Sequence, residues 1–371
     1  MPGIRMLGIR MPWLQGRTRY LLDLSLAGDQ ESMDSNSSST SLVIGLAAFG
    51  LGVVIAGVQL YRRRRAEGAG GPAEEEIEVE GGRGEEEQSV AEDLADDGEA
   101  HESMGANVPQ EDGSLIAFFA LVFALAAPFW LVGDRKLPTA INLPASALAT
   151  FVPVTAAAIL SYRKDGFNGV KQLLKKAFDY RKIKSKTWLL PALLLAPAIY
   201  FSSYVIMRLT GAPLPDPVSI PLSMLPAYFL MFFIGDAGEE LGWSGYAIDP
   251  MQNRWGALRA SILLGVVWAV WHAIPFVQTG NPTSWVVWQS FKTVVMRIVI
   301  VWIYNNAGRS VLAAILFHTS DNISWSLFPN NGSGYDPLVT GMVTCLTAVI
   351  AIFGWGGRTL RRYRYARVGR A

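Results

Sequence analysis

Cysteine and histidine are scarce in this sequence. Cys345 is the one cysteine in 371 residues, and there are three histidines. A disulfide within the chain and a cysteine-rich zinc module are therefore both excluded. Charged residues are also few, at 17% of the chain, which is low for a soluble protein.

Hydrophobic residues are abundant, at 51%, and they gather in long runs. A helix needs about 20 apolar residues to cross a bilayer. Nine runs approach this length, at 42–60, 115–132, 140–162, 188–209, 220–236, 257–276, 285–304, 311–328 and 338–355. We expect an all-α, polytopic transmembrane helical bundle of about eight core helices, preceded by one N-terminal anchor helix that is not a removable signal peptide.

The net charge of +1 conceals an uneven distribution. Residues 66–113 contain 17 acidic residues and one basic residue, so the rest of the chain carries a charge of +17. Basic residues follow every second apolar run, at 62–65, 163–186, Arg254, Arg309 and 358–370. Because Lys and Arg collect in cytoplasmic loops, this pattern predicts a multi-pass plasma-membrane protein with a cytoplasmic C-terminus.

These patterns divide the chain into five parts. We expect an N-terminal arm at 1–41, an anchor with a basic stop at 42–65, an acidic disordered linker at 66–113, a membrane-embedded domain at 114–356 and a basic tail at 357–371. Residues 166–186 mix lysines with apolar residues at helical spacing. This segment is either a helix lying on anionic lipid or an ordinary basic loop.

Ionisable residues within the apolar runs are few, and a charge inside a membrane usually has a function. The residues are Asp236, Glu239, Glu240, His272, Lys292, Arg297 and His318, with Asn322 one turn after His318. Taken singly, Glu239 and Glu240 could begin a solvated loop, and His272 could belong to an interfacial aromatic belt. We favour a functional site over a chance grouping, because two intramembrane histidines, an asparagine and a glutamate pair occur together.

Three segments carry a resemblance to a known family. They are EELGWSGYAI at 239–248, WAVWHAIPF at 268–276 and ILFHTSDN at 315–322. Their order and spacing are similar to the three motifs of the CAAX-protease and bacteriocin-processing family of intramembrane endopeptidases, also called the Abi family. The resemblance covers about half of the chain.

The resemblance implies a function for the domain at 114–356. It would be a protease domain that hydrolyses a peptide bond of a membrane-associated protein or peptide. Glu239 would be the base that activates water with the help of His272, and Glu240 would orient the site. His318 and Asn322 would bind the scissile carbonyl and stabilise its oxyanion.

The sequence departs from the family pattern at two positions. Ser244 stands where the first motif usually has an arginine, and Trp268 stands where the second motif often has phenylalanine. Without a guanidinium beside it, Glu240 would favour its neutral form. Three other arginines could supply the missing charge: Arg254, Arg259 and Arg297.

Metal dependence stays open at this stage. We favour a reaction without a cofactor, although Glu239, His272 and His318 could bind zinc or another divalent metal. The expected partners are membrane lipids and a membrane-associated protein or peptide, and nucleic acid is not expected. The alternative functions are an inactive immunity or scaffolding protein, which Ser244 favours, and a proton-coupled transporter, against which the absence of an internal repeat argues.

Overall fold

A computed structural model describes residues 111–133 and 145–361. The predicted parts at 1–41 and 42–65, and most of 66–113 and 357–371, lie outside the described residues. Within the described ranges the elements are helices, and no strand occurs. The main helices are α3 (Glu111–Val132), α4 (Val152–Lys175), α5 (Leu189–Leu209), α6 (Leu225–Gly242), α7 (Ile248–Trp255), α8 (Ala257–Gln278), α9 (Thr283–Asn306), α10 (Val311–Leu327) and α11 (Pro337–Trp355).

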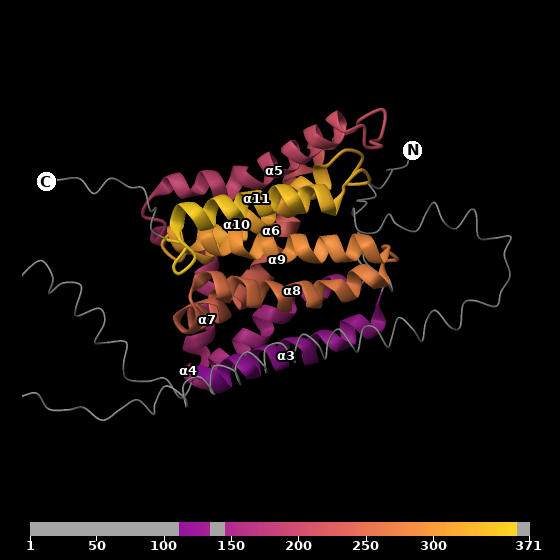
Figure 1. Cartoon of the computed structure of the whole chain (residues 1–371). Helices are drawn as coiled ribbons and strands as arrows, with labels where there is room; N and C mark the ends of the chain where they lie inside the picture. Colours follow the sequence, from indigo (N-terminus) through magenta and orange to yellow (C-terminus); the bar gives the residue numbers. More distant parts are fainter. Residues whose placement is uncertain (1–110, 134–144, 362–371) are drawn as a thin grey trace, which may run out of the picture.

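The helices pack side by side (Figure 1). Helices α5 and α11 lie at one edge of the view, α3 and α4 lie at the other, and α8 and α9 lie between them. Helix α6 packs against α4 and α10, and α10 also packs against α5 and α9. The predicted all-α transmembrane bundle is confirmed for the part of the chain that the structure describes.

Six of the described helical segments are long and apolar enough to cross a membrane, and α6 and α10 are not among them. The runs predicted at 220–236 and 311–328 correspond to α6 and α10, which are helical but shorter or more polar than the other six. Helix α6 has 18 residues, but three of them are the carboxylates Asp236, Glu239 and Glu240, and α10 has only 17 residues. Both helices can carry polar residues because neighbouring helices shield these residues from lipid.

The large buried side chains explain where the core lies. Phe118 of α3, Trp243, Trp268 of α8 and Phe317 of α10 are each almost completely inaccessible to solvent. By contrast, α5 and α11 keep many large apolar side chains exposed on their outer faces. An exposed apolar face is what a helix needs where it contacts lipid.

Short polar motifs fix the ends of the helices around the site. The Ser310 hydroxyl accepts a hydrogen bond from the backbone N–H of Ala313 and so caps α10. After α6 the chain makes a π-helical turn, Trp243–Ala247, before α7. In a π turn the backbone hydrogen bond spans one residue more than in an α-helix, and such turns are frequent at functional sites.

Candidate functional site

The three carboxylates of α6 are buried near the C-terminal end of that helix. Asp236, Glu239 and Glu240 have exposed fractions of 3%, 6% and 0%. The alternative in which Glu239 and Glu240 begin a solvated loop was therefore wrong. Consecutive helical residues point about 100° apart, and Glu239 accordingly contacts α8 while Glu240 contacts α9 and α10.

Both oxygens of Glu239 accept hydrogen bonds, and the shortest of these is to Oε2. Its Oε2 accepts hydrogen bonds from the indole N–H of Trp268 at 2.7 Å and from that of Trp243 at 3.4 Å. Its Oε1 lies 3.4 Å from the Thr150 hydroxyl and 3.9 Å from His272 Nε2. The orientation of the carboxylate is thus fixed from one side, and its other oxygen faces the imidazole.

The histidine opposite Glu239 has a defined tautomer. His272 Nδ1 lies 3.1 Å from the backbone carbonyl oxygen of Trp268. A carbonyl oxygen can only accept, so Nδ1 carries the proton, and in the neutral ring the Nε2 lone pair faces Glu239. The His272 side chain is also more accessible than that of Glu239, with exposed fractions of 22% and 8%.

Glu240 is paired with a guanidinium group, although the first motif itself contains no arginine. Arg297 of α9 donates from Nη1 to Glu240 Oε2 at 2.9 Å, and both side chains are completely buried. The Ser244 hydroxyl donates to the same oxygen. Of the alternatives left open by the sequence, the one in which another arginine supplies the missing charge is therefore confirmed, and that arginine is Arg297.

The other two arginines considered for this role lie elsewhere. Arg259 is exposed at the start of α8, and Arg254 lies on α7 beside the ring of Trp255. Of the three, Arg297 alone contacts Glu240. Its guanidinium also lies over the face of the Trp268 ring at 4.0 Å, an attractive arrangement for a cation.

His318 and Asn322 face the carboxylates of α6 from α10. His318 Nδ1 lies 3.2 Å from Glu240 Oε1, and its Nε2 lies 3.6 Å from Asp236 Oδ1. Asn322 donates from Nδ2 to the same Asp236 oxygen at 2.8 Å. The one-turn spacing of His318 and Asn322 thus places both on the face of α10 that packs against α6.

Trp268 lies against Glu239, Arg297 and both histidines, and no role in the site was predicted for it from the sequence. Besides donating to Glu239 and stacking under Arg297, its ring lies 5.2 Å from the His272 ring and 5.1 Å from the His318 ring, centroid to centroid. The signal available was its departure from phenylalanine, because only tryptophan brings an N–H donor.

Lys292 does not join the cluster on α6, although the sequence grouped it there. Its ammonium nitrogen lies 2.5 Å from Asp321 Oδ2 and 3.3 Å from the Tyr200 hydroxyl, and all three side chains are buried. Asp321 was not predicted, although it lies between His318 and Asn322 in the third motif, and its side chain is directed to α9 rather than to α6. This second cluster joins α9, α10 and α5.

The three residues predicted as metal ligands do not converge on one point. The nitrogens of His318 face Glu240 and Asp236, whereas His272 Nε2 lies 3.9 Å from Glu239 Oε1. Within 111–133 and 145–361, no group of three or more His, Cys, Asp or Glu side chains is arranged to hold a metal ion. The residues present therefore do not fit a three-ligand metal site.

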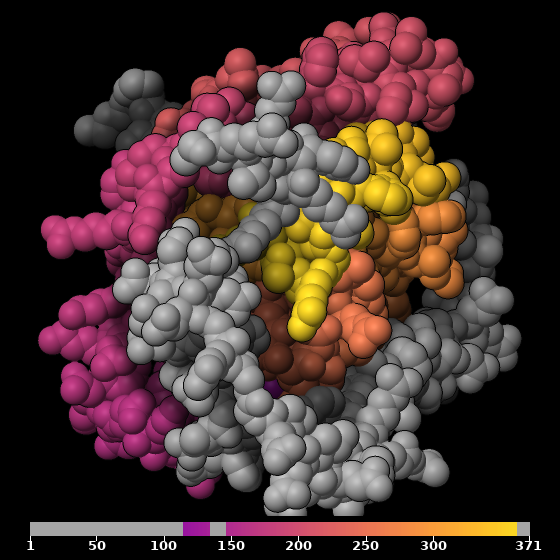
Figure 2. Space-filling view, turned by 60° about the vertical axis from the view of Figure 1, so that its left-hand side comes forward, coloured from indigo at the N-terminus to yellow at the C-terminus, as the bar shows by residue number. Residues whose placement is uncertain are grey.

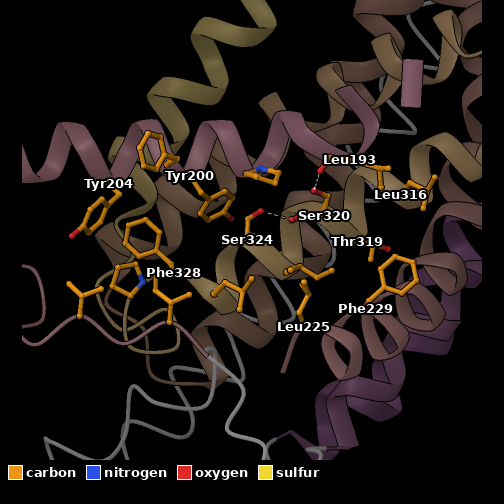
Figure 3. A pocket seen from close by; sticks show the side chains of 17 residues that line it. Leu193, Tyr200, Tyr204, Leu225, Phe229, Leu316, Thr319, Ser320, Ser324 and Phe328 are labelled. Carbon is orange, nitrogen blue, oxygen red and sulfur yellow. Dashed lines mark hydrogen bonds between the residues drawn. The ribbon is translucent and has the colours of Figure 1, made fainter. Parts of the chain in front are cut away.

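A cavity of about 510 Å³ lies against α10, the helix that carries His318 and Asn322 (Figure 3). Helices α5 and α10, the start of α6 and the loop before it form its walls. On α10, Thr319 and Ile323 line it, and these residues directly follow His318 and Asn322. The hydroxyl of Ser320 donates to the Leu193 carbonyl and that of Ser324 donates to the Ser320 carbonyl, which leaves a wall that is mainly apolar.

Comparison with known proteins supports this assignment of motifs. Residues 221–324 match the family described as type II CAAX prenyl endopeptidase Rce1-like. A similar protein is CAAX prenyl protease 2 of Methanococcus maripaludis, which is 30% identical over 171 residues. The match covers 42% of this chain and 62% of the length of that relative. Across residues 221–324, which contain all three motifs, the resemblance predicted from the sequence is confirmed as a match to the Rce1-like CAAX prenyl endopeptidase family.

Proposed function

We propose that the chain is an intramembrane endopeptidase that hydrolyses a peptide bond of a membrane-associated protein or peptide, as in CAAX-type or bacteriocin-like processing. The observation that carries the proposal is the pair formed by Glu239 and His272. Glu239 Oε1 and His272 Nε2 are both hydrogen-bond acceptors, and they face each other across 3.9 Å. One water molecule can donate a hydrogen bond to each of them.

The reaction follows from this placement. Glu239 takes a proton from the water, and the hydroxide oxygen adds to the scissile carbonyl carbon, which gives a tetrahedral oxyanion. Asn322 holds Asp236 with one N–H and has a second N–H for the oxyanion, to which His318 also donates. The C–N bond then breaks, and Glu239 returns the proton to the departing amine.

Glu240 acts on this reaction through its neighbours. It is completely buried, it pairs with Arg297, and it lies 3.2 Å from His318 Nδ1. Contact with a fixed carboxylate holds an imidazole in one orientation. We assign Glu240 and Arg297 as positioning residues, which is the role that the resemblance implies for Glu240.

The apolar lining of the cavity favours a substrate that carries an apolar group. The walls of this cavity are formed by residues such as Phe229, Leu316 and Phe328, and its lining on α10 includes Thr319, which lies about 100° around the helix from His318. A prenyl chain, as in the name of the archaeal relative, has the chemistry that such a wall accepts. The substrate we propose therefore carries its apolar group in this cavity and its peptide bond at Glu239.

The alternative of an inactive relative depended on Ser244. Arg297 supplies the charge that Ser244 lacks, so this observation no longer favours the alternative. No contact within the described residues specifically favours a proton-coupled transporter. We also propose that the reaction needs no cofactor, and proteolysis should then persist after treatment with a metal chelator.

The test uses the purified full chain in detergent with two quenched fluorescent peptides that differ only in a prenyl group. We expect Glu239→Gln and His272→Ala each to remove most of the turnover. Asp249→Asn on α7 is a matched control, because it makes the same carboxylate-to-amide change outside the cluster. Cleavage that survives in folded Glu239→Gln protein would overturn the mechanism.

The membrane orientation belongs to the same proposal. The structure places 163–186, Arg309 and Arg358 near one end of the bundle, since Asp179 contacts the start of α10 and Arg358 contacts the start of α8. We propose that this end faces the cytoplasm of a plasma membrane. A cysteine placed at exposed Gln172, with Cys345 replaced by serine, should react with an impermeant maleimide only after the cells are opened.

A further inference from the structure

The chain between α4 and α5 forms a distinct surface at one end of the bundle. Helix α4 kinks at Asp165 and Gly166, where Gly166 has a φ of +59°, a backbone conformation that favours glycine. The chain then packs closely on the first half of the helix, because a Cβ at Gly169 would lie 2.4 Å from the carbonyl oxygen of Ser161. Three short 3-10 turns follow before α5.

This surface, which we define as residues 163–186, is strongly basic. It contains nine basic and two acidic residues. The side chains of Arg163, Lys164, Lys171, Lys175, Arg181, Lys182, Lys184 and Lys186 are exposed. In Figure 2, which views the molecule from this end, the residues near 150–190 form the magenta edge of the face. A high density of positive charge attracts anions from the membrane surface.

Large apolar side chains lie among these charges. Phe167 is 81% exposed and Phe178 is 75% exposed. The Phe178 ring lies 6.4 Å from the ring of Phe233 on α6, which in turn stacks on Phe229. The exposed apolar surface is therefore continuous from the basic segment onto α6, as expected at the boundary between lipid headgroups and acyl chains.

The same segment contacts the ends of two of the four helices that carry the candidate site, α6 and α10. Lys176 donates from Nζ to the Gly245 carbonyl at 2.5 Å, in the π turn that follows α6. Asp179 accepts hydrogen bonds from the backbone N–H groups of Val311 and Leu312, at 3.1 Å and 3.2 Å. Any ligand that orders residues 163–186 would also order the ends of α6 and α10.

We propose that the surface 163–186 binds anionic lipid headgroups and that the bound lipid stabilises the ends of α6 and α10. The other candidate occupant is the acidic segment 66–113 of the same chain, which matches the charge. Phe167 and Phe178 favour lipid, because 66–113 contains few large apolar residues that could cover them. The proposal does not depend on proteolysis, so it can fail or succeed separately from the proposed function.

The test measures binding of dioctanoyl-phosphatidylglycerol to the full chain in detergent, with dioctanoyl-phosphatidylcholine as the neutral probe. We expect the phosphatidylglycerol affinity to fall about tenfold or more when Lys171, Lys175, Lys182 and Lys184 are changed to glutamine. The matched control changes the same four lysines to arginine, which keeps the charge, and it should bind like the parent. Equal affinity of the glutamine and arginine variants would overturn the proposal.

Two further variants separate the possible occupants. Phe167→Ser with Phe178→Ser should weaken phosphatidylglycerol binding while all basic residues are kept, and an unchanged affinity would contradict the role of the aromatic anchors. Deletion of residues 74–102 should leave the affinity unchanged. An increase of about tenfold or more after this deletion would identify the acidic segment as the occupant instead. Phosphatidylglycerol should also raise the thermal unfolding midpoint of the parent but not of the glutamine variant.

Discussion

The buried pair between Arg297 and Glu240 gives the sharpest prediction. Both side chains are completely buried, and the two charged atoms are 2.9 Å apart. Removing one partner of such a pair leaves an uncompensated buried charge, which costs about 3–5 kcal/mol. Arg297→Met, which keeps much of the side-chain length, should therefore lower the thermal unfolding midpoint by roughly 6–20 °C, at about 2–4 °C per kcal/mol for a domain of this size.

A double-mutant cycle tests the reasoning. Glu240→Gln with Arg297→Met removes both charges, and such replacements are often close to neutral, so the double variant should be more stable than Arg297→Met alone. Arg259→Met is the matched control, because Arg259 is exposed and should change the midpoint little. Equal midpoints for Arg297→Met and the parent would refute the assignment of Arg297 as the partner of Glu240.

The same pair determines the expected effect of Ser244→Arg. An added arginine in the parent would place a second long side chain where Ser244 is 2% exposed, and overpacking costs about 1–3 kcal/mol. In the Arg297→Met background the same change should restore a guanidinium next to Glu240 and recover part of the lost midpoint. Failure of Ser244→Arg to improve that background would show that the position cannot replace Arg297.

Three other outcomes are expected. Trp268→Phe should reduce turnover while the protein stays folded, because it removes the 2.7 Å hydrogen bond that orients Glu239, and steady-state kinetics with a circular dichroism control measures this. Lys292→Met should lower the unfolding midpoint in detergent by leaving Asp321 buried and unpaired, and Asp321→Asn in the same chain should recover part of the loss. Deletion of 74–102 should leave the midpoint unchanged, because that segment lacks the apolar residues that a packed core requires, and a large drop would contradict this.

The transmembrane bundle could be predicted from the sequence because it depends on residue type and local run length. The grouping of the motif residues could also be predicted, since charges are rare within apolar helices. The choice of Arg297 over Arg254 and Arg259 could not, because it depends on how α9 is rotated and placed against α6. Spacing within one helix contains no information about that rotation.

Other contacts escaped prediction for a related reason. Asp321 belongs to the third motif by position but contacts Lys292 of α9 rather than a residue of α6, and only the packing of α9 shows this. Tryptophan is typical of the membrane interface, whereas the indole N–H of Trp268 donates a hydrogen bond to Glu239 in the interior. The short helices α6 and α10 were predicted as full spans because hydropathy does not show which helices are covered by others.

The burial of three carboxylates on one short helix has a consequence for biogenesis. Arg297 follows Glu240 by 57 residues, so α6 is synthesised before the side chain that neutralises it exists. A segment with three buried carboxylates is unfavourable in lipid by itself. Stable insertion of α6 therefore requires α9 and α10, and the order in which the ribosome makes the helices differs from the order in which the membrane can accept them.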